Sequence, residues 1–552
     1  MDRRAFLKIS AAAATVAAMS AYGMDMLRVT NASMKSSSAS TLPSSSSAAT
    51  SARPANSTSL VSSLSSATKP ISATSSTSTA SRNSSLSSLI SSSQTTRKTS
   101  TTTTTTQSTT STNPVQADTI PALLQIPHLL RRAGFGASPT ELAQFQAMDF
   151  DSAVDYLVNY AQITPNLTDV PNIRPSYSGQ VPSGQNELNN LATWWMSHMV
   201  QTNRPLEEKM TLFWHNHFAT AYSKVQNGFL MYQQYQFLKA NALGNFHDML
   251  MGIVSDGAML IWLDGNANKA NNPNENFARE VMEVFSTGRG PYTQTDVTMG
   301  AKAFTGYSIN SSGQGVFNPA QHDNSVKTFL GQTGNFGPAD IINVLVARPE
   351  TATNLATELF EFFVYPNPTP DVVQRFADVF TSSNYDMKAV VSAILKSPEF
   401  VSNQAYLANV KSPVEYIATA LRSLGATATN NSELVTMTNQ GQFLFNPPSV
   451  FGWPAGTGWI NTGVMMERFN FPIGVQTSKE NPASTLDPGS IVGTGTQEDK
   501  DVVALVSRLF PDGMPSEVTQ VIQSATVNIS DPALRVKNVV RLVMASPFYN
   551  LN

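Results

Sequence analysis

Cysteine is absent from all 552 residues, which excludes disulfides, thiolate metal ligands and cysteine nucleophiles. Charge is also scarce, since Asp, Glu, Lys and Arg together make up only 13% of the chain. Acidic residues outnumber basic ones by 38 to 35, whereas phosphate binding needs clustered positive charge, so we predict no nucleic-acid partner. Beyond Gly23 there is no apolar run near the roughly 20 residues that a membrane helix requires, so we predict no transmembrane span in the mature chain.

The first residues carry an export signal. Arg3 and Arg4 stand next to each other and are followed by Ala-Phe-Leu-Lys, the pattern of a twin-arginine leader. The Ala-rich run Ile9–Ala21 is too short for a comfortable membrane span but suits a signal peptide. We predict a signal peptide over residues 1–23 and an extracytoplasmic protein, secreted or held at the cell surface; cleavage of the leader and its retention as an anchor both remain open.

A long linker follows. Between Ser36 and Asn113, 49 of 78 residues are Ser or Thr. Such a composition buries too little apolar surface to offset the conformational entropy of folding. We therefore interpret residues 24–118 as a disordered Ser/Thr-rich stalk, either O-glycosylated or unmodified.

Residues 119–552 show helical periodicity with little strand-like alternation. Ser138 with Pro139 and Glu141 marks a helix start, and Pro205 opens another. The pattern continues over Asp340–Val346, Thr351–Phe363, Pro370–Phe380 and Met387–Leu395. We predict a mainly α fold, with one large multi-helix domain and irregular loops.

Two histidines stand out in the segment Trp214–Phe218. On an extended backbone His215 and His217 would share a face and could both bind a metal. On a helix they lie about 200° apart, and His217 then falls on the inward face with Phe213. The alternative is one buried, hydrogen-bonded histidine in an aromatic core helix.

A second segment, Pro273–Phe285, places two acids on a helix. Glu280 and Glu283 lie three residues apart, so the pair could perform acid–base chemistry or hold a divalent metal. The alternative is an intrahelical salt bridge between Arg279 and Glu283, which leaves Glu280 as the sharper candidate.

Two loops complete the set of candidates. His322 and Asp323 could serve as a ligand and an acid–base group, or Asp323 could simply cap a turn. The loop Phe445–Pro454 is rich in aromatic residues and proline; Trp453 and Trp459 could stack on a sugar ring or fill the core.

Together these stretches resemble the bacterial and archaeal domain of unknown function (DUF) 1800 family. The motifs that carry the resemblance are Leu129–Gly136, Phe213–Phe218, Asn274–Glu280, Ala303–Gly306, His322–Asp323 and Pro447–Pro454. Val281, Val284 and Ser286 depart from the residues usual in the family. The resemblance implies one exported domain after the stalk, and it supplies no activity, substrate or cofactor.

These features support two hypotheses of different classes. The first is a metal-dependent hydrolase of an envelope or extracellular polymer. It requires His217, Glu280 and His322 to meet in one pocket. The candidate ligands of a divalent metal such as Zn²⁺ are His215, His217, His322 and Glu280, and the candidate catalytic acids are Glu280, Glu283 and Asp323. The second is a non-catalytic surface binder or scaffold, with carbohydrate or another exported envelope protein as partner.

An oxidoreductase with an organic cofactor is disfavoured, because no Gly-rich fingerprint follows a strand.

Overall fold

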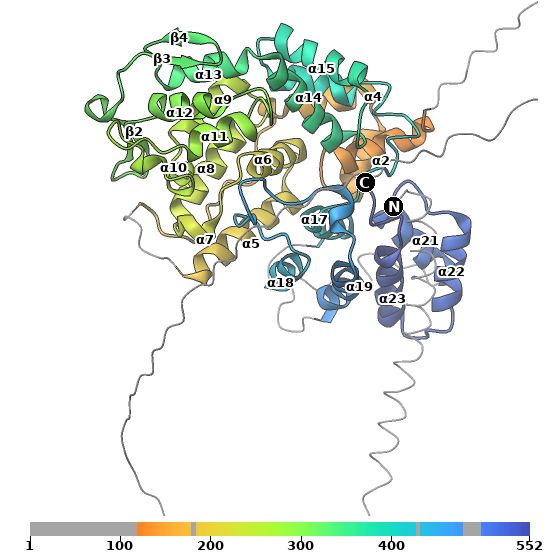
Figure 1. The fold of residues 1–552 in the computed structure, drawn as a ribbon. Coiled ribbons are helices and arrows are strands. Elements are labelled where there is room, and N and C mark those ends of the chain that lie inside the picture. The colour runs from red at the N-terminus through yellow and green to blue at the C-terminus, as the bar shows by residue number, and fades with distance from the viewer. Residues whose placement is uncertain (1–118, 178–183, 427–430, 478–497) are drawn as a thin grey trace, which may run out of the picture. The chain divides into compact units, whose positions relative to one another are not determined.

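The computed structural model describes residues 119–177, 184–426, 431–477 and 498–552. The predicted leader and stalk, residues 1–23 and 24–118, lie outside the described residues. Regular structure in the described ranges is almost entirely helical, which confirms the mainly α prediction (Figure 1). No helix among the described residues has the length and hydropathy needed to cross a membrane.

The first part of the domain surrounds a central helix, α6 (Pro205–His217). The helices before it are α2 (Ala122–Arg132), α3 (Pro139–Gln146), α4 (Phe150–Val158) and α5 (Gln185–Gln201). Those after it are α7 (Tyr222–Val225), α8 (Gly228–Ala240), α9 (Phe246–Val254), α10 (Gly257–Trp262), α11 (Asn276–Glu283) and α12 (Gln294–Ala303).

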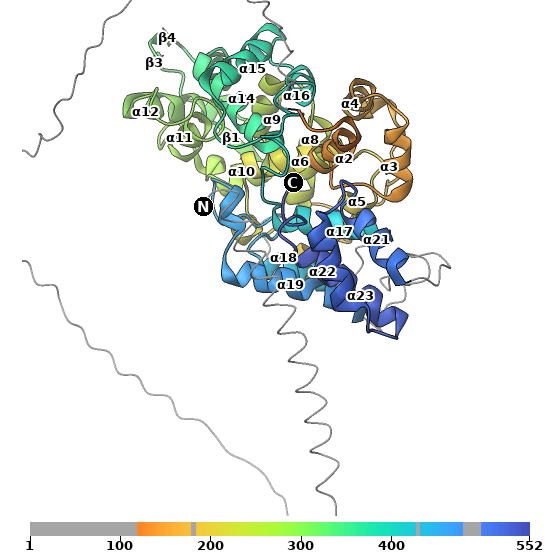
Figure 2. The ribbon, with the colours of Figure 1, turned by 90° about the vertical axis from the view of Figure 1, so that its right-hand side faces the viewer.

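Two short antiparallel hairpins follow α12 in the described chain. β1 (Tyr307–Ile309) pairs with β2 (Gly315–Phe317), and β3 (Lys327–Phe329) pairs with β4 (Gln332–Gly334). The next helices are α13 (Pro338–Val346), α14 (Pro349–Phe363), α15 (Pro370–Ser382) and α16 (Met387–Leu395). The C-terminal group comprises α17 (Pro413–Leu424), α18 (Asn431–Asn439), α19 (Thr462–Thr477), α21 (Glu498–Leu509), α22 (Ser516–Thr526) and α23 (Pro532–Ala545), which lie together in both views (Figures 1 and 2).

Local sequence signals fix where several helices begin. Ser138 caps α3 through a capping box with Glu141, and Ser412 caps α17 in the same way with Glu415. Pro205 occupies the first turn of α6, where its missing N–H removes no helical hydrogen bond. The predicted starts at Pro139 and Pro205 are therefore correct, because capping depends on neighbours in the sequence.

Two hydrophobic cores meet around α6. One contains Met210, Phe213 and Trp214 of α6 together with the apolar faces of α9 and α11 to α16. The other contains Leu212 together with the apolar faces of α5, α17, α21 and α23. Every residue of α6 except Asn216 is buried, so this helix connects the two cores along its whole length.

A buried ion pair joins α6 to α17. Lys209 is only 1% exposed and binds the carboxylate of Glu415. Its ammonium also lies 5.3 Å from the ring centroid of Phe135 and 5.2 Å from that of Phe362. The second oxygen of Glu415 accepts the Ser412 amide at 2.7 Å. A charge removed from water needs such partners. The pair therefore holds α17 in one position against α6, where the two cores meet.

We expect Lys209→Met to lower the free energy of unfolding by about 3–5 kcal/mol, because it leaves Glu415 buried without its cation. Chemical denaturation would measure the change. The double variant Lys209→Met, Glu415→Gln should lose less than Lys209→Met alone. Lys396→Met, which breaks the exposed pair of Lys396 with Asp155, should cost under about 1 kcal/mol. Equal losses for the buried and exposed pairs would contradict this role.

Candidate functional site

His215 lies inside the core at the C-terminal end of α6. Its Nε2 accepts the backbone N–H of Phe445 at 3.1 Å. Its ring lies 5.2 Å from those of Trp195 and Phe445 and 5.4 Å from that of Trp453. Burial lowers the pKa of His215 to about 3, so the ring is neutral. Because Phe445 already uses the lone pair of Nε2, this nitrogen is not free to bind a metal.

His217 faces the other core and has two fixed partners. Its Nδ1 lies 2.8 Å from a carboxylate oxygen of Glu358 on α14, and its Nε2 lies 3.3 Å from the carbonyl oxygen of Phe285. Each ring nitrogen of His217 thus faces an oxygen of the protein, one on α14 and one just after α11. Asn354, one turn before Glu358, donates to its other oxygen at 3.3 Å and to the Ser286 carbonyl at 3.0 Å.

Neither Glu358 nor Asn354 stood out in the sequence. Their only signal was a spacing of four residues on the helix predicted over Thr351–Phe363, and many surface pairs share that spacing. Nothing local indicated that this helix would face His217 across 141 positions of the chain.

His322 and Asp323 belong to a separate cluster at Thr305. The Nδ1 of His322 lies 3.0 Å from the Thr305 carbonyl oxygen, and the Asp323 amide donates to the Thr305 hydroxyl at 2.8 Å. The carboxylate of Asp323 accepts the amide of Ser325 at 2.8 Å. Beneath this loop, the buried ammonium of Lys327 donates to the carbonyls of Asp323 and Ser325. Asp323 thus organises a turn, the alternative raised by the sequence.

The two histidine clusters lie at opposite ends of α11. His217 contacts Phe285, just after the helix, whereas the Thr305 cluster connects through Asn268 to the amide of Asn274, just before it. Eight helical residues span about 12 Å. Within the described ranges no group of three or more His, Asp or Glu side chains could hold a metal ion. His215, His217, His322 and Glu280 therefore do not assemble into the predicted metal centre, because the first two spend their ring nitrogens on protein partners.

Glu283, on α11, is held in its charged form. Its Oε2 accepts the hydroxyl of Tyr292 at 2.8 Å, and its Oε1 binds the guanidinium of Arg289. These bonds, that of Tyr292 foremost, lower the pKa of Glu283. The salt bridge considered between Arg279 and Glu283 is not formed, since Arg279 pairs at 3.2 Å with Glu275, one turn earlier.

Glu280, also on α11, has no such bonds. It is half-buried, and neither of its carboxylate oxygens makes a hydrogen bond or ion pair with any residue that the structure describes. Its Oε2 is fully shielded from solvent. Burial, reinforced by the charge of Glu283, raises the pKa of Glu280. Two carboxyl groups three residues apart thus have their pKa values pushed in opposite directions.

The aromatic loop covers the end of α6. The Trp453 amide donates to the side-chain oxygen of Asn216 at 2.7 Å, and a side chain at Gly452 would collide with Asn216. Trp453 and Trp459 are 5% and 4% exposed, so they fill the core and offer no stacking surface. Phe451 instead is 55% exposed and lies 5.2 Å from the guanidinium of Arg289.

The low pKa of His215 gives a testable pH dependence. In the unfolded chain the pKa of His215 is about 6.5, whereas in the fold burial lowers this pKa to about 3. The titration of His215 therefore leaves the free energy of unfolding unchanged above about pH 6.5. Below that pH the unfolded chain binds a proton that the fold does not, so the free energy of unfolding falls by up to ~1.4 kcal/mol per pH unit. We expect His215→Gln, which keeps an acceptor without the titration, to unfold with a flatter dependence between about pH 6.5 and pH 4. His247→Gln, at a partly exposed histidine of α9, serves as the control; identical slopes for wild type and His215→Gln would refute the assignment.

Comparison with known proteins places this arrangement in a family. No match was found among curated proteins or among solved structures. A family model described as "Protein of unknown function (DUF1800)" matches residues 128–551, which include both histidine clusters, the α11 acids and the aromatic loop. The chain therefore belongs to the DUF1800 family.

Proposed function

We propose that the domain works outside the cytoplasmic membrane as a hydrolase of an extracellular polymer, with Glu280 as its proton donor and acceptor and Glu283 as a charged group that stabilises the reacting carbon. The observation that carries the proposal is the unpartnered, shielded oxygen of Glu280, three residues from the fully bonded carboxylate of Glu283. An unpaired buried carboxyl group lowers the stability of the fold, so a catalytic role explains its presence better than a structural one.

The two environments suit different roles in cleaving a glycosidic bond. Glu280, with its raised pKa, can donate a proton to the leaving oxygen. Glu283 stays charged through Tyr292 and Arg289 and can stabilise the positive charge that develops on the sugar carbon. Water then adds to that carbon and returns its proton to Glu280. The bond is broken with the elements of one water molecule, and no step passes through a metal.

Two other acids among the described residues differ from this pair. Glu399 also has one buried oxygen without a hydrogen bond, but its other oxygen pairs with Arg375 at 2.6 Å. Asp323 has its carboxylate engaged in the turn before Lys327. Neither has a second acid with an opposed pKa on the same helix, so the proposal stays with Glu280 and Glu283.

A non-catalytic surface binding module is the second candidate. The observation that favours it is the exposed Phe451, which stacks with Arg289 on the surface. An exposed aromatic beside a charged group offers both apolar contact and hydrogen bonding to a polymer.

The purified mature chain should release reducing ends from a polysaccharide in a panel of extracellular polymers. Glu280→Gln keeps the shape of the side chain without the proton and should reduce the rate about 100-fold or more. Glu517→Gln, the same change at an exposed position of α22, should leave it unaltered. Full activity of the Glu280→Gln protein would eliminate Glu280 as the acid, and polymer binding without hydrolysis by the wild type would favour the second candidate.

Export across the cytoplasmic membrane can be tested separately, by changing the leader. Replacing Arg3 and Arg4 by Lys keeps the charge but removes the twin-arginine pair, so we expect precursor to accumulate in the cytoplasm of fractionated cells. Replacing Arg53 and Arg82 of the stalk by Lys in the same way should not affect export. Unimpaired export of the leader variant would exclude the twin-arginine route.

A further inference from the structure

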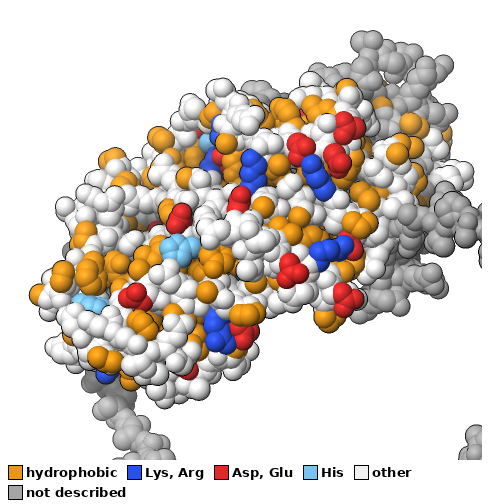
Figure 3. All heavy atoms as spheres, turned by 90° about the horizontal axis from the view of Figure 1, so that it is seen from above, with side chains coloured by type: hydrophobic (Ala, Val, Ile, Leu, Met, Phe, Trp, Pro, Cys, Tyr) orange, Lys and Arg blue, Asp and Glu red, His pale blue; other side chains and the backbone are white. Residues whose placement is uncertain are grey.

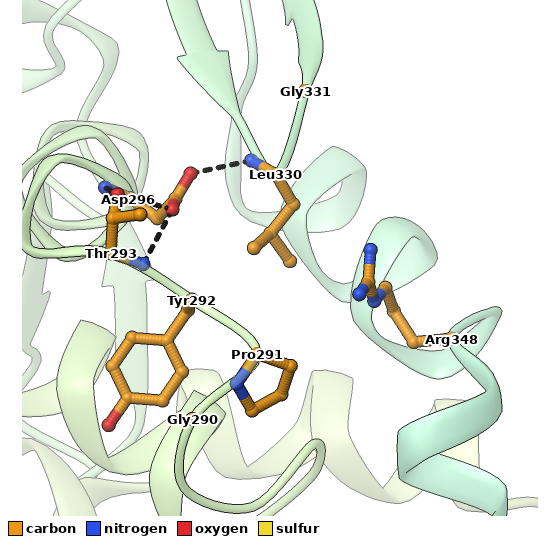
Figure 4. Close-up of a pocket in the computed structure, with 8 residues that line it drawn as sticks. All are labelled: Gly290, Pro291, Tyr292, Thr293, Asp296, Leu330, Gly331 and Arg348. Atoms are coloured by element: carbon orange, nitrogen blue, oxygen red, sulfur yellow. Dashed lines mark hydrogen bonds between the residues drawn. The ribbon is translucent and has the colours of Figure 1, made fainter.

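A hollow is connected to Glu283 through Tyr292, which lines it, although neither Glu280 nor Glu283 does. It has a volume of about 420 Å³, and its walls come from the segment before α12, the β3–β4 turn and the start of α14 (Figure 4). Tyr292 lines it, and the hydroxyl of the same Tyr292 donates to Glu283. Across the space from Pro291, Figure 4 shows the side chains of Leu330 and Arg348. Tyr292 therefore stands between the hollow and Glu283, toward which its hydroxyl points.

We infer that this hollow is a subsite for a neutral, hydroxyl-rich sugar unit of a linear polysaccharide. The inference rests on the proposed function and adds the substrate class to it. The volume lies at the lower end of the range for small-ligand sites, roughly 300–1,000 Å³, and suits one sugar unit with its waters.

The charges around the hollow are already compensated. The carboxylate of Asp296 accepts the amide of Leu330 at 2.7 Å and both the amide and the hydroxyl of Thr293 at 2.8 and 2.6 Å. Arg348 gives its Nε and Nη2 to the two oxygens of Glu350. A site for a uronate or phosphate would need a cation in excess, so the balance favours an uncharged ligand.

The wider surface has the same character. On the face that carries β3, β4, α14 and α15, acidic and basic side chains lie interspersed, without a patch of one sign (Figure 3). Next to Glu283, Arg289 is likewise paired rather than free.

Arg348 still has a hydrogen-bond donor that could bind the hydroxyl groups of a sugar in the hollow. Nη1 of Arg348 makes no hydrogen bond with the part of the chain that the structure describes, and this side chain is 30% exposed. The rim is open at Gly290 and Gly331, where no heavy atom lies within 4 Å of the place a Cβ would take. Both have positive φ, 112° and 82°, which favours glycine and keeps the entrance free of side chains.

An apolar platform lies on the other side of the acids. Arg289 binds one oxygen of Glu283 and Tyr292 the other, so Glu283 separates Arg289 from the hollow. Over Arg289 lies the exposed ring of Phe451, against which the C–H face of a sugar can pack. A linear chain can thus rest on Phe451, pass the two acids and place its next unit in the hollow.

The test is calorimetric titration of the full mature chain carrying Glu280→Gln. The probes are neutral linear hexasaccharides from glucan, xylan, mannan and chitin, with hexagalacturonate as the charged probe. We expect at least one neutral hexasaccharide to bind more tightly than hexagalacturonate. Adding Arg348→Ala or Phe451→Ala should weaken that binding about tenfold each, the effect of losing one good contact.

Matched controls separate the contacts from the fold. Arg375→Ala removes another paired surface arginine, and Phe317→Ala removes another exposed aromatic, 43% against 55%. Both should leave the binding unchanged, and thermal melting checks that every variant is folded. Binding of no neutral probe, tighter binding of hexagalacturonate, or unchanged affinity in both Arg348→Ala and Phe451→Ala would overturn the subsite.

The two proposals fail in different ways. If the wild type binds the neutral chain through Arg348 and Phe451 but never cleaves it, the hydrolase fails and the sugar site stands. If Glu280→Gln abolishes hydrolysis while Arg348→Ala and Phe451→Ala bind normally, the hydrolase stands and the subsite is wrong.

Discussion

A helix that is buried on all sides is stable only when its polar groups find partners, and this requirement shapes the domain around α6. Lys209 meets Glu415 on one side, and the indole N–H of Trp214 donates to the Ala242 carbonyl at 2.9 Å. At the C-terminal end His215 accepts from Phe445 and His217 binds Glu358. Each contact brings in a segment distant in sequence, so the polar groups of α6 determine which parts of the chain meet.

The same requirement explains why neighbouring histidines do not form a metal centre. The lone pair of Nε2 in His215 accepts the backbone N–H of Phe445, and both ring nitrogens of His217 face oxygens of the protein. Their residue types suit a metal, yet their environment uses them to join helices. Like the pair of Lys209 with Glu415, the contact of His217 with Glu358 joins α6 to a helix that is distant in the chain.

Glu280 is an exception to the requirement that buried polar groups find partners, and for this reason we propose a function for it. Its neighbour Glu283 is bonded through both oxygens, whereas Glu280 is shielded without a bond. The polar surroundings of Glu283 extend to Arg289 and Phe451 in one direction and to Tyr292 and the hollow in the other. Catalysis and recognition can then share one short stretch, from the end of α11 to the start of α12.

The sequence by itself determined the properties that depend on near neighbours. Helical periodicity predicted the mainly α fold, and capping residues such as Ser138 predicted helix starts. The family motifs were recognisable for the same reason, since each is a short continuous stretch. The turn at Asp323 stood among the local alternatives.

Tertiary structure alone decided what those residues do, because partners far apart in the chain are specified by packing and not by local pattern. It placed Glu358 beside His217 and Phe445 beside His215, so that both histidines bind segments distant in the chain. It put His217 and His322 at opposite ends of α11, paired Glu283 with Arg289 in place of Arg279, and buried Trp453 while exposing Phe451. Protonation and ligand-binding capacity follow from burial and from the nearest partner atoms, and only the folded chain supplies those.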